Sequence, residues 1–278
     1  MPTYAAADGT PLAYDLVGAG GRSPLVVVAG GACLPPGYLG DLAGLSGVRP
    51  LLLPHLRGVG ESPRPAEPEA GSYWRQAEDV EALRAHLGVE RLALAAHSAG
   101  TRLALAWAAR FPGSVERLLL VTPPAGVVPG AVADGDAVLD ARRGDPAVEA
   151  ALAARERGPD LTGSESYTAY VQSVMPLSYA AWTARERAHA APQRYDVEAI
   201  RAYFSVPPPE DLVGRCAGVS APVLVVAGAQ DPVGPTPPRV VARLFPRGEV
   251  VTVDRCGHFP WVEQPDAFRR AVDPFVTG

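Results

Sequence analysis

Three side chains of this sequence, Ser98, Asp231 and His258, are of the types that together make a serine nucleophilic. A serine hydroxyl is a weak nucleophile near neutral pH unless a neighbouring base takes its proton. A histidine acts as that base when a carboxylate fixes its tautomer and stabilises the imidazolium that forms. The chain order of serine, aspartate and histidine is one of the known orders for such a set. We therefore predict a catalytic triad that attacks a carbonyl carbon.

Ser98 lies in residues 96–100 (Ala-His-Ser-Ala-Gly), between an apolar run at 91–95 and a helical pattern at 101–110. A serine between small residues at a sharp strand-to-helix turn is a nucleophile elbow, which lifts the hydroxyl above the edge of a sheet. The following helix would direct its N-terminal amides and its positive dipole end at the same place. Ala96 stands where this pattern usually has glycine. The alternative for Ser98 is an ordinary helix N-cap.

His258 is the predicted general base among the five histidines of the chain. It follows the last predicted strand and precedes a helix, so its loop should return to the sheet edge that carries the elbow. His86 and His189 are predicted to be exposed on helices, and His97 to pack or hydrogen-bond beside the nucleophile. His55 ends a predicted strand and is close enough in the expected fold to reach the rim of the site.

Asp231 is the predicted carboxylate partner of His258, because it follows the predicted strand at 222–227 at the same edge. Its alternative role is that of a turn aspartate before Pro232. Asp254 is the competing carboxylate, since it lies close to His258 in the sequence.

Two backbone amides are predicted to form an oxyanion hole. One belongs to Ala99, directly after the nucleophile, and the other follows the predicted strand at 25–29. We assign the second amide to Gly31, with Ala32 as the next choice. The alternative is that Gly30 and Gly31 only form a tight turn, although glycine also permits close approach of the backbone to a ligand.

Short apolar runs alternate with helical patterns along most of the chain. The predicted strands are 3–6, 12–16, 25–29, 49–53, 91–95, 117–121, 222–227 and 249–253. The predicted helices outside the middle of the chain are 73–87, 101–110, 237–244 and 266–276. This alternation is typical of an α/β protein with a mostly parallel central sheet. The first two strands, which flank Asp8-Gly9, are predicted to form a hairpin.

The strand pattern stops between about 123 and 218, where the sequence is helical and broken by glycine and proline. Such a segment is too long for a loop. We predict a helical cap (lid) at 125–216, inserted over the C-terminal edge of the sheet, where the sites of α/β proteins lie. The core would then consist of 1–124 and 217–278.

Composition limits the possible partners. The 278 residues are 47% hydrophobic, which is ordinary for a globular protein, and no apolar run reaches the length of a membrane span. The first residues lack the features of a secretory signal, and three scattered cysteines indicate neither a disulfide framework nor a zinc site. A net charge of −5 without a basic run argues against nucleic acid. We expect a cytoplasmic protein acting on a small molecule, without metal, cofactor or membrane partner; the oligomeric state is not indicated.

The chain resembles the α/β-hydrolase superfamily in its capped single-domain branch, and within it the proline iminopeptidase-like hydrolases and esterases. The motifs that carry this resemblance are 28–31 (Val-Ala-Gly-Gly), 55–62 (His-Leu-Arg-Gly-Val-Gly-Glu-Ser), the elbow, 227–232 (Ala-Gly-Ala-Gln-Asp-Pro) and 257–260 (Gly-His-Phe-Pro). The resemblance implies an α/β-hydrolase fold and hydrolysis through an acyl-enzyme. Epoxide hydrolases and haloalkane dehalogenases resemble the same scaffold but use aspartate at the elbow, so Ser98 argues against both.

The chain departs from the family pattern at several positions. Family members often have histidine where Ala29 stands and aspartate where His55 stands. Proline iminopeptidases resemble His-Gly-Gly-Pro-Gly where residues 29–33 are Ala-Gly-Gly-Ala-Cys, and usually have tryptophan where His97 stands. These departures put peptidase activity in doubt and leave the hydrolytic machinery intact.

We expect the substrate to be a small-to-medium apolar ester, thioester, lactone or amide. The candidate substrate-binding residues are Gly30, Ala32, Cys33, His97, Tyr170, Tyr179, Trp182 and Phe259. A proline iminopeptidase-type aminopeptidase would need an acid in the cap to bind an α-amine; the candidates are Glu149, Glu156, Glu165 and Glu186. Two further alternatives stay open: a lyase, cyclase or C–C bond hydrolase of natural-product metabolism, and a ligand-binding module that has lost catalysis.

Overall fold

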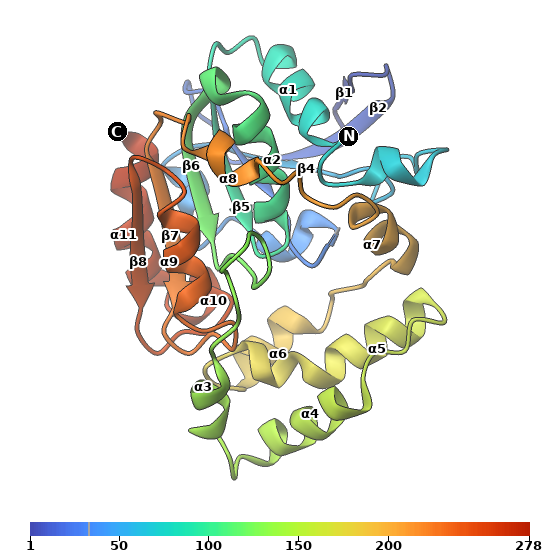
Figure 1. Ribbon diagram of the computed structural model, residues 1–278, viewed down its shortest axis with the longest axis vertical. Helices are drawn as coiled ribbons and strands as arrows, with labels where there is room; N and C mark the ends of the chain where they lie inside the picture. The colour runs from blue at the N-terminus through green and yellow to red at the C-terminus, as the bar shows by residue number, and fades with distance from the viewer. Residues whose placement is uncertain (33) are drawn as a thin grey trace.

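One mostly parallel sheet forms the centre of the molecule (Figure 1). Within the residues that the computed structural model describes, 1–32 and 34–278, eight strands take the order β1-β2-β4-β3-β5-β6-β7-β8. β1 pairs with β2, and β2 with β4, in antiparallel fashion, and all other neighbours are parallel. The strands are β1 (Thr3–Ala5), β2 (Pro11–Val17), β3 (Leu25–Val28), β4 (Leu51–Pro54), β5 (Leu92–His97), β6 (Val115–Val121), β7 (Val223–Gly228) and β8 (Gly248–Val253). The predicted fold class is confirmed.

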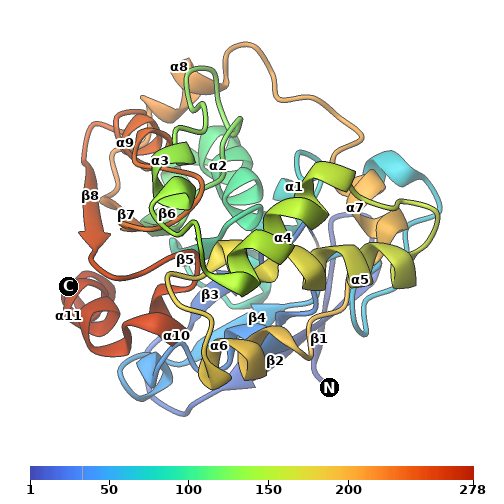
Figure 2. The same ribbon diagram turned by 90° about the horizontal axis from the view of Figure 1, so that it is seen from below.

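Helices cover both faces of this sheet and its C-terminal edge (Figures 1 and 2). The α-helices are α1 (Ala77–His86), α2 (Gly100–Arg110), α3 (Asp136–Asp140), α4 (Pro146–Arg157), α5 (Ser164–Val174), α6 (Ala184–Ala190), α7 (Val197–Tyr203), α8 (Leu212–Cys216), α9 (Thr236–Ala242), α10 (Pro260–Glu263) and α11 (Pro265–Thr277). Short 3-10 helices are η1 (Pro36–Leu39), η2 (Leu45–Gly47), η3 (Pro68–Gly71), η4 (Pro112–Ser114) and η5 (Met175–Ser178). None of the helices in the described part of the chain has the length and apolar character needed to cross a bilayer.

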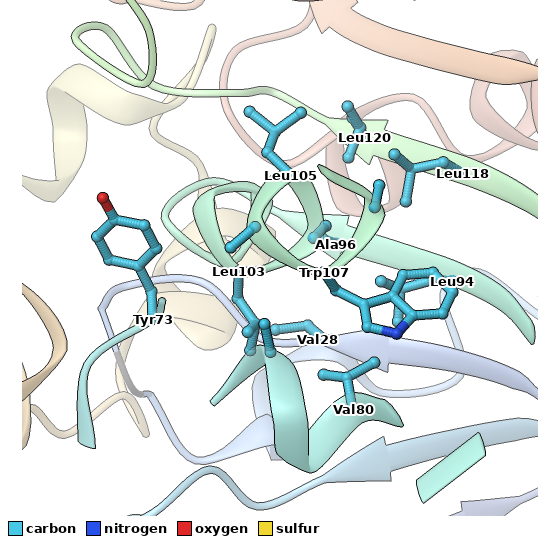
Figure 3. Packing of buried hydrophobic residues seen from close by; sticks show 14 of the residues in the cluster. Val28, Tyr73, Val80, Leu94, Ala96, Leu103, Leu105, Trp107, Leu118 and Leu120 are labelled. Carbon is cyan, nitrogen blue, oxygen red and sulfur yellow. The ribbon is translucent and has the colours of Figure 1, made fainter. Parts of the chain in front are cut away.

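Strands β3, β4 and β7 are apolar and buried along their whole length because each face of the sheet packs on its own core. Successive side chains of a strand point to opposite faces. In β5, Leu94 and Ala96 join the core formed with α1, α2, α8 and α9. Ala93 and Ala95 join the second core, with η1, η2, α10 and α11. Figure 3 shows the first core, where strand residues such as Leu94 pack beneath α2 and its buried Trp107.

The observed elements end within two residues of the predicted ones, except at the start of α1. A helix was predicted over 73–87, but α1 begins at Ala77. The amide of Tyr73 instead donates to the carbonyl of Tyr203, 3.0 Å away. The side chain of Gln76 binds the amide of Arg57 and the carbonyl of Gly71. Tyr73 is therefore buried although it lies in a loop before α1. Its spacing from the buried Ala77 and Val80 is nevertheless that of a helix.

Between β6 and β7 the chain is fully described and forms helices α3 to α8 with no strand. Figures 1 and 2 show α3, α4, α5 and α6 together, beyond the C-terminal ends of the parallel strands. α8 instead lies beside α2, and its Leu212 and Cys216 belong to the first core. The division into a core of 1–124 and 217–278 and a cap at 125–216 stays a proposal. The packing of α8 favours a cap that ends before this helix.

The order of the strands places a crevice between the loops that follow β3 and β5. From β3 the chain continues to β4, toward one edge of the sheet, and from β5 it continues to β6, toward the other edge. In open α/β sheets, ligands bind where the connections diverge in this way, outside the carboxyl ends of the strands. Residues 29–32 and the turn at Ser98 therefore face each other across this point.

Gly100 permits the close packing of α2 on β3. A Cβ atom at this position would lie 2.4 Å from the carbonyl oxygen of Ala29 and 3.0 Å from Cγ1 of Val28. The neighbours are backbone and a β-branched side chain, which have little room to move. The absence of a side chain at Gly100 therefore sets the distance between the elbow helix and the sheet.

We expect Gly100→Ala to lower the free energy of unfolding by about 1–3 kcal/mol, because overpacking outweighs the better helix propensity of alanine. Urea denaturation followed by circular dichroism measures this change. Gly113→Ala in η4 is the matched control, since nothing lies within 4 Å of a Cβ there. An equal effect of the two substitutions would show that the close approach at Gly100 is not required.

Candidate active site

Ser98 occupies the turn between β5 and α2 in a left-handed backbone conformation, with a φ of 49°. A non-glycine residue in this region costs about 1–3 kcal/mol and persists only where the surrounding structure holds it. The amide of Ser98 donates to the carbonyl of Val121 at 2.9 Å. Its carbonyl accepts from both the amide and the hydroxyl of Thr101. The turn thus fixes the backbone on both sides and leaves the Ser98 side chain partly exposed.

The structure brings the three predicted triad side chains into one chain of hydrogen bonds. Nδ1 of His258 lies 2.7 Å from Oδ2 of Asp231, and Nε2 lies 2.8 Å from Oγ of Ser98. A carboxylate only accepts, so Nδ1 carries the proton and Nε2 of the neutral ring is free to accept from the serine hydroxyl. The second oxygen of Asp231 accepts from the amide of Val233 at 2.9 Å. Asp254, the competing carboxylate, is exposed and makes no hydrogen bond to His258.

The surroundings of His258 raise its pKa above the ordinary histidine value. Burial by itself opposes the charged form, but the negative charge of Asp231 and its hydrogen bond to Nδ1 more than offset this effect. The charge of Glu263 acts in the same direction. A raised pKa makes the imidazole a better proton acceptor, at the cost of a larger protonated fraction at acidic pH.

Three backbone amides beside Ser98 are available to bind an anion. Among the described residues, no group accepts a hydrogen bond from the amides of Gly31, Ala32 or Ala99. A Cβ on Gly30 would lie 2.9 Å from Cβ of Ser98, so the loop after β3 lies directly against the elbow. The N-terminus of α2 adds its positive dipole end at this point. This is the arrangement expected of an oxyanion hole, whose assignment to Gly31 and Ala99 remains a prediction.

Tyr38 and His97 connect the loop after β3 to the loop of His258. The amide of Gly30 donates to the Tyr38 hydroxyl at 2.7 Å, and this hydroxyl lies 2.7 Å from Nδ1 of His97. Nε2 of His97 lies 3.0 Å from the carbonyl oxygen of His258. A carbonyl only accepts, so Nε2 carries the proton and the tyrosine donates to Nδ1. Burial lowers the pKa of His97 and raises that of Tyr38, so both groups stay neutral.

The remaining predicted substrate-binding residues differ in exposure. Tyr179 and Phe259 are buried and stack on each other with ring centroids 4.6 Å apart. Trp182 and Tyr170 are partly exposed in the helical region between β6 and β7. Cys33 lies outside the described residues. Contact of these side chains with a substrate stays a prediction.

His189 differs from its prediction as an exposed histidine, because it is partly buried between the cap and η1. Its Nδ1 lies 2.7 Å from the hydroxyl of Tyr179, and its Nε2 donates to the carbonyl of Tyr38 at 2.9 Å. The charged residues around it in the sequence concealed this contact. His55 binds Asp15 and the amide of Glu61, so it holds its own loop.

Sequence reasoning missed three residues that hold the site. Tyr38 lies in a proline-glycine-rich loop with no motif to mark it. Thr122, whose hydroxyl donates to the carbonyl of His258 at 3.1 Å, follows a strand directly, and that position is a usable signal. Glu263 binds the amides on either side of His258, and no sequence motif marks it.

The described residues contain no group of three or more His, Cys, Asp or Glu side chains arranged to hold a metal ion.

A serine at a sharp strand-to-helix turn on a mostly parallel sheet is typical of the α/β-hydrolases. Comparison with known proteins supports the same class. A family model for the alpha/beta hydrolase fold matches residues 41–265. The chain belongs to this family and is a hydrolase-type enzyme. This confirms the resemblance drawn from the sequence motifs.

Solved structures with the same fold have low sequence identity to the chain. The enol-lactonase from Burkholderia xenovorans LB400 is 24% identical, with a TM-score of 0.72 over 100% of both chains. A thermophilic esterase from Thermogutta terrifontis is 22% identical, with a TM-score of 0.68 over 99% of this chain and 97% of the other. A proline iminopeptidase from Mycobacterium smegmatis is 20% identical, with a TM-score of 0.73 over 99% and 97%. At these identities the likeness shows the fold alone.

We expect Tyr38→Phe to lower the free energy of unfolding by about 1–3 kcal/mol, because the Gly30 amide and Nδ1 of His97 lose their partner inside the protein. Chemical denaturation measures this loss. Tyr14→Phe is the matched control: both tyrosines are 8% exposed, but the Tyr14 hydroxyl has only a contact of 3.4 Å to exposed His86. If Tyr38→Phe is no less stable than Tyr14→Phe, the network does not hold the loop.

Proposed function

We propose that the protein is a serine hydrolase in which Ser98 is the nucleophile, His258 the general base and Asp231 the carboxylate that orients the base. The observation that carries the proposal is the continuous hydrogen-bonded path from Asp231 through His258 to a serine held at positive φ. An ordinary N-cap serine needs neither the strained backbone nor the imidazole partner. A ligand-binding module would have no physical need for the complete set.

The proposed reaction is acyl transfer to water in two halves. Nε2 of His258 takes the proton of Ser98 Oγ as the oxygen attacks the substrate carbonyl carbon, and Asp231 stabilises the imidazolium. The amides of Gly31 and Ala99 hold the negative oxygen of the tetrahedral intermediate. His258 then gives its proton to the leaving group, which departs and leaves an ester on Ser98. A water molecule, deprotonated by His258, hydrolyses this acyl-enzyme.

The proposed substrate is a small-to-medium apolar ester, thioester, lactone or amide. Tyr38, which binds the Gly30 amide, also lines a cavity of about 370 Å³ between η1 and residues 192–194, but Ser98 and His258 do not line it. The titles of the similar structures name a lactonase and an esterase, which agrees with this class.

The aminopeptidase alternative receives less support from the cap acids. Glu186 accepts from the amide and the hydroxyl of Thr183, and Glu149 from the amide of Gly144 and from Arg143. Both carboxylates therefore serve their own helix ends. Glu156 and Glu165 are exposed on α4 and α5, where solvent screens their charge.

We expect a fluorophosphonate probe to label the wild-type protein at one site, and Ser98→Ala to abolish labelling, because only an activated serine reacts. Intact-mass spectrometry measures the stoichiometry. The same substitution should lower kcat toward a chromogenic ester by about 10³-fold or more. Ser205→Ala, which changes an exposed serine, is the control and should label fully. Labelling that persists in Ser98→Ala, or folded wild-type protein that does not react, would contradict the proposal.

A further inference from the structure

Glu263 is a buried carboxylate that the proposed triad does not use. It is 8% exposed and accepts hydrogen bonds from three backbone amides. Its Oε2 accepts from Ala180 at 2.7 Å and from Gly257 at 3.0 Å, and its Oε1 accepts from Phe259 at 3.1 Å. All of these partners are donors, so the site suits the ionised form. Burial raises the pKa of Glu263, and the three amides oppose that rise.

The amides that Glu263 binds surround the proposed general base. Gly257 and Phe259 are the neighbours of His258 on either side. The amide of His258 itself donates to the carbonyl of Ser178 at 2.7 Å. Three successive amides are thus fixed, two of them by Glu263 and one by the segment that includes Ala180. Because one oxygen of Glu263 binds both Ala180 and Gly257, this carboxylate is where the cap segment and the His258 loop meet.

Helix capping accounts for only part of this arrangement. Phe259 is the N-cap residue of α10, and Glu263 accepts from its amide from the fourth position of the helix, one residue beyond the N3 position of a capping box. The amides of Ala180 and Gly257 lie outside α10, and that helix has only four residues. Capping a single helical turn would not by itself offset the cost of burying a carboxylate. The additional hydrogen bonds, to the amides of Ala180 and Gly257, therefore indicate that Glu263 fixes the His258 loop.

We propose that Glu263 is a positioning residue for His258: it ties the peptide groups on both sides of the base to residues 178–180 and so keeps Nε2 within hydrogen-bond distance of Ser98 Oγ. This inference rests on the proposed function, in which His258 is the general base. A misplacement of about 1 Å at reacting groups lowers the rate by about 100-fold. The carbonyl of His258, held by His97 and Thr122, anchors the opposite side of the same loop.

The charge of Glu263 has a second consequence. The titratable groups around the base are Asp231, His97, Cys256 and Glu263. Burial lowers the pKa of His97 and raises that of the Cys256 thiol, so both are uncharged near neutral pH. Asp231 and Glu263 therefore supply the negative charge that, against burial, raises the pKa of His258. Glu263 itself interacts electrostatically with Glu186, Tyr179 and Arg142.

The test compares two substitutions of Glu263. In Glu263→Gln one acceptor oxygen becomes an NH₂ group that faces a backbone donor. We expect kcat for a chromogenic ester to fall about tenfold or more, with KM nearly unchanged, because the base is misplaced and not the substrate. The acid limb of kcat/KM should move to lower pH, since His258 without this negative charge loses its proton more easily. Glu263→Asp keeps the charge on a shorter side chain, so kcat should fall while the acid limb stays.

The control is Glu249→Gln, which neutralises an exposed carboxylate of β8 with no hydrogen bond to the described chain. It should retain the wild-type kcat and pH profile. An NMR titration of the His258 imidazole in wild type and Glu263→Gln measures the charge effect without turnover. Fluorophosphonate labelling of wild type and Ser98→Ala reports the proposed function separately.

A folded Glu263→Gln protein with wild-type kcat and an unchanged His258 titration would overturn the inference, even where labelling supports Ser98 as the nucleophile. If Glu263→Gln does not fold, Glu263→Asp decides the matter. Wild-type kcat in that variant would show that the position of the carboxylate does not set the position of the base.

Discussion

The backbone of Ser98 must adopt a left-handed conformation, and most features of the site follow from this constraint. The turn reverses the chain from β5 into α2 within a single residue, so the two elements approach closely. Gly30 and Gly100 have no side chain at the points of contact, where an added Cβ would meet backbone atoms at less than 3 Å. The strain at Ser98 is thus balanced by the packing of β3, β5, β6 and α2 around it. The same packing places the Ala99 amide, which donates to no other described residue, directly after Ser98.

The loop of His258 shows a second principle, in which the proposed general base is positioned by contacts with its backbone. Its amides and carbonyl bind Glu263, Ser178, His97 and Thr122, which come from separate parts of the chain. The imidazole is then left to hydrogen-bond Ser98 and Asp231. Since Ser178 and Ala180 belong to the helical region between β6 and β7, that region contributes to the placement of the base as well as to the cover of the site. The hydrogen bond from His189 to the carbonyl of Tyr38 is a further contact between this helical region and the core of the protein.

Much of this architecture could be predicted from the sequence because short-range signals and topology agree. Strands buried on both faces appear as continuous apolar runs, and Ser98 and Asp231 each follow such a run. His258 follows β8, whose side chains are mostly exposed. Tyr38, Glu263 and His189 could not be assigned in this way. Their partners lie in remote loops, and neither periodicity nor spacing encodes how such loops cross. The predicted start of α1 was wrong for a related reason. Tyr73 has helical spacing, but it lies in a loop and its amide donates to the carbonyl of Tyr203.

We propose that hydrolysis proceeds through an ester on Ser98. The most direct measurement is to mix the protein with a short-chain activated ester, stop the reaction with acid within the first turnover, and map the modified peptide by mass spectrometry. We expect an acyl group on Ser98 and a burst of leaving group equal to the enzyme concentration when deacylation is slow. Turnover without acylated Ser98, or an acyl group on another residue, would contradict it.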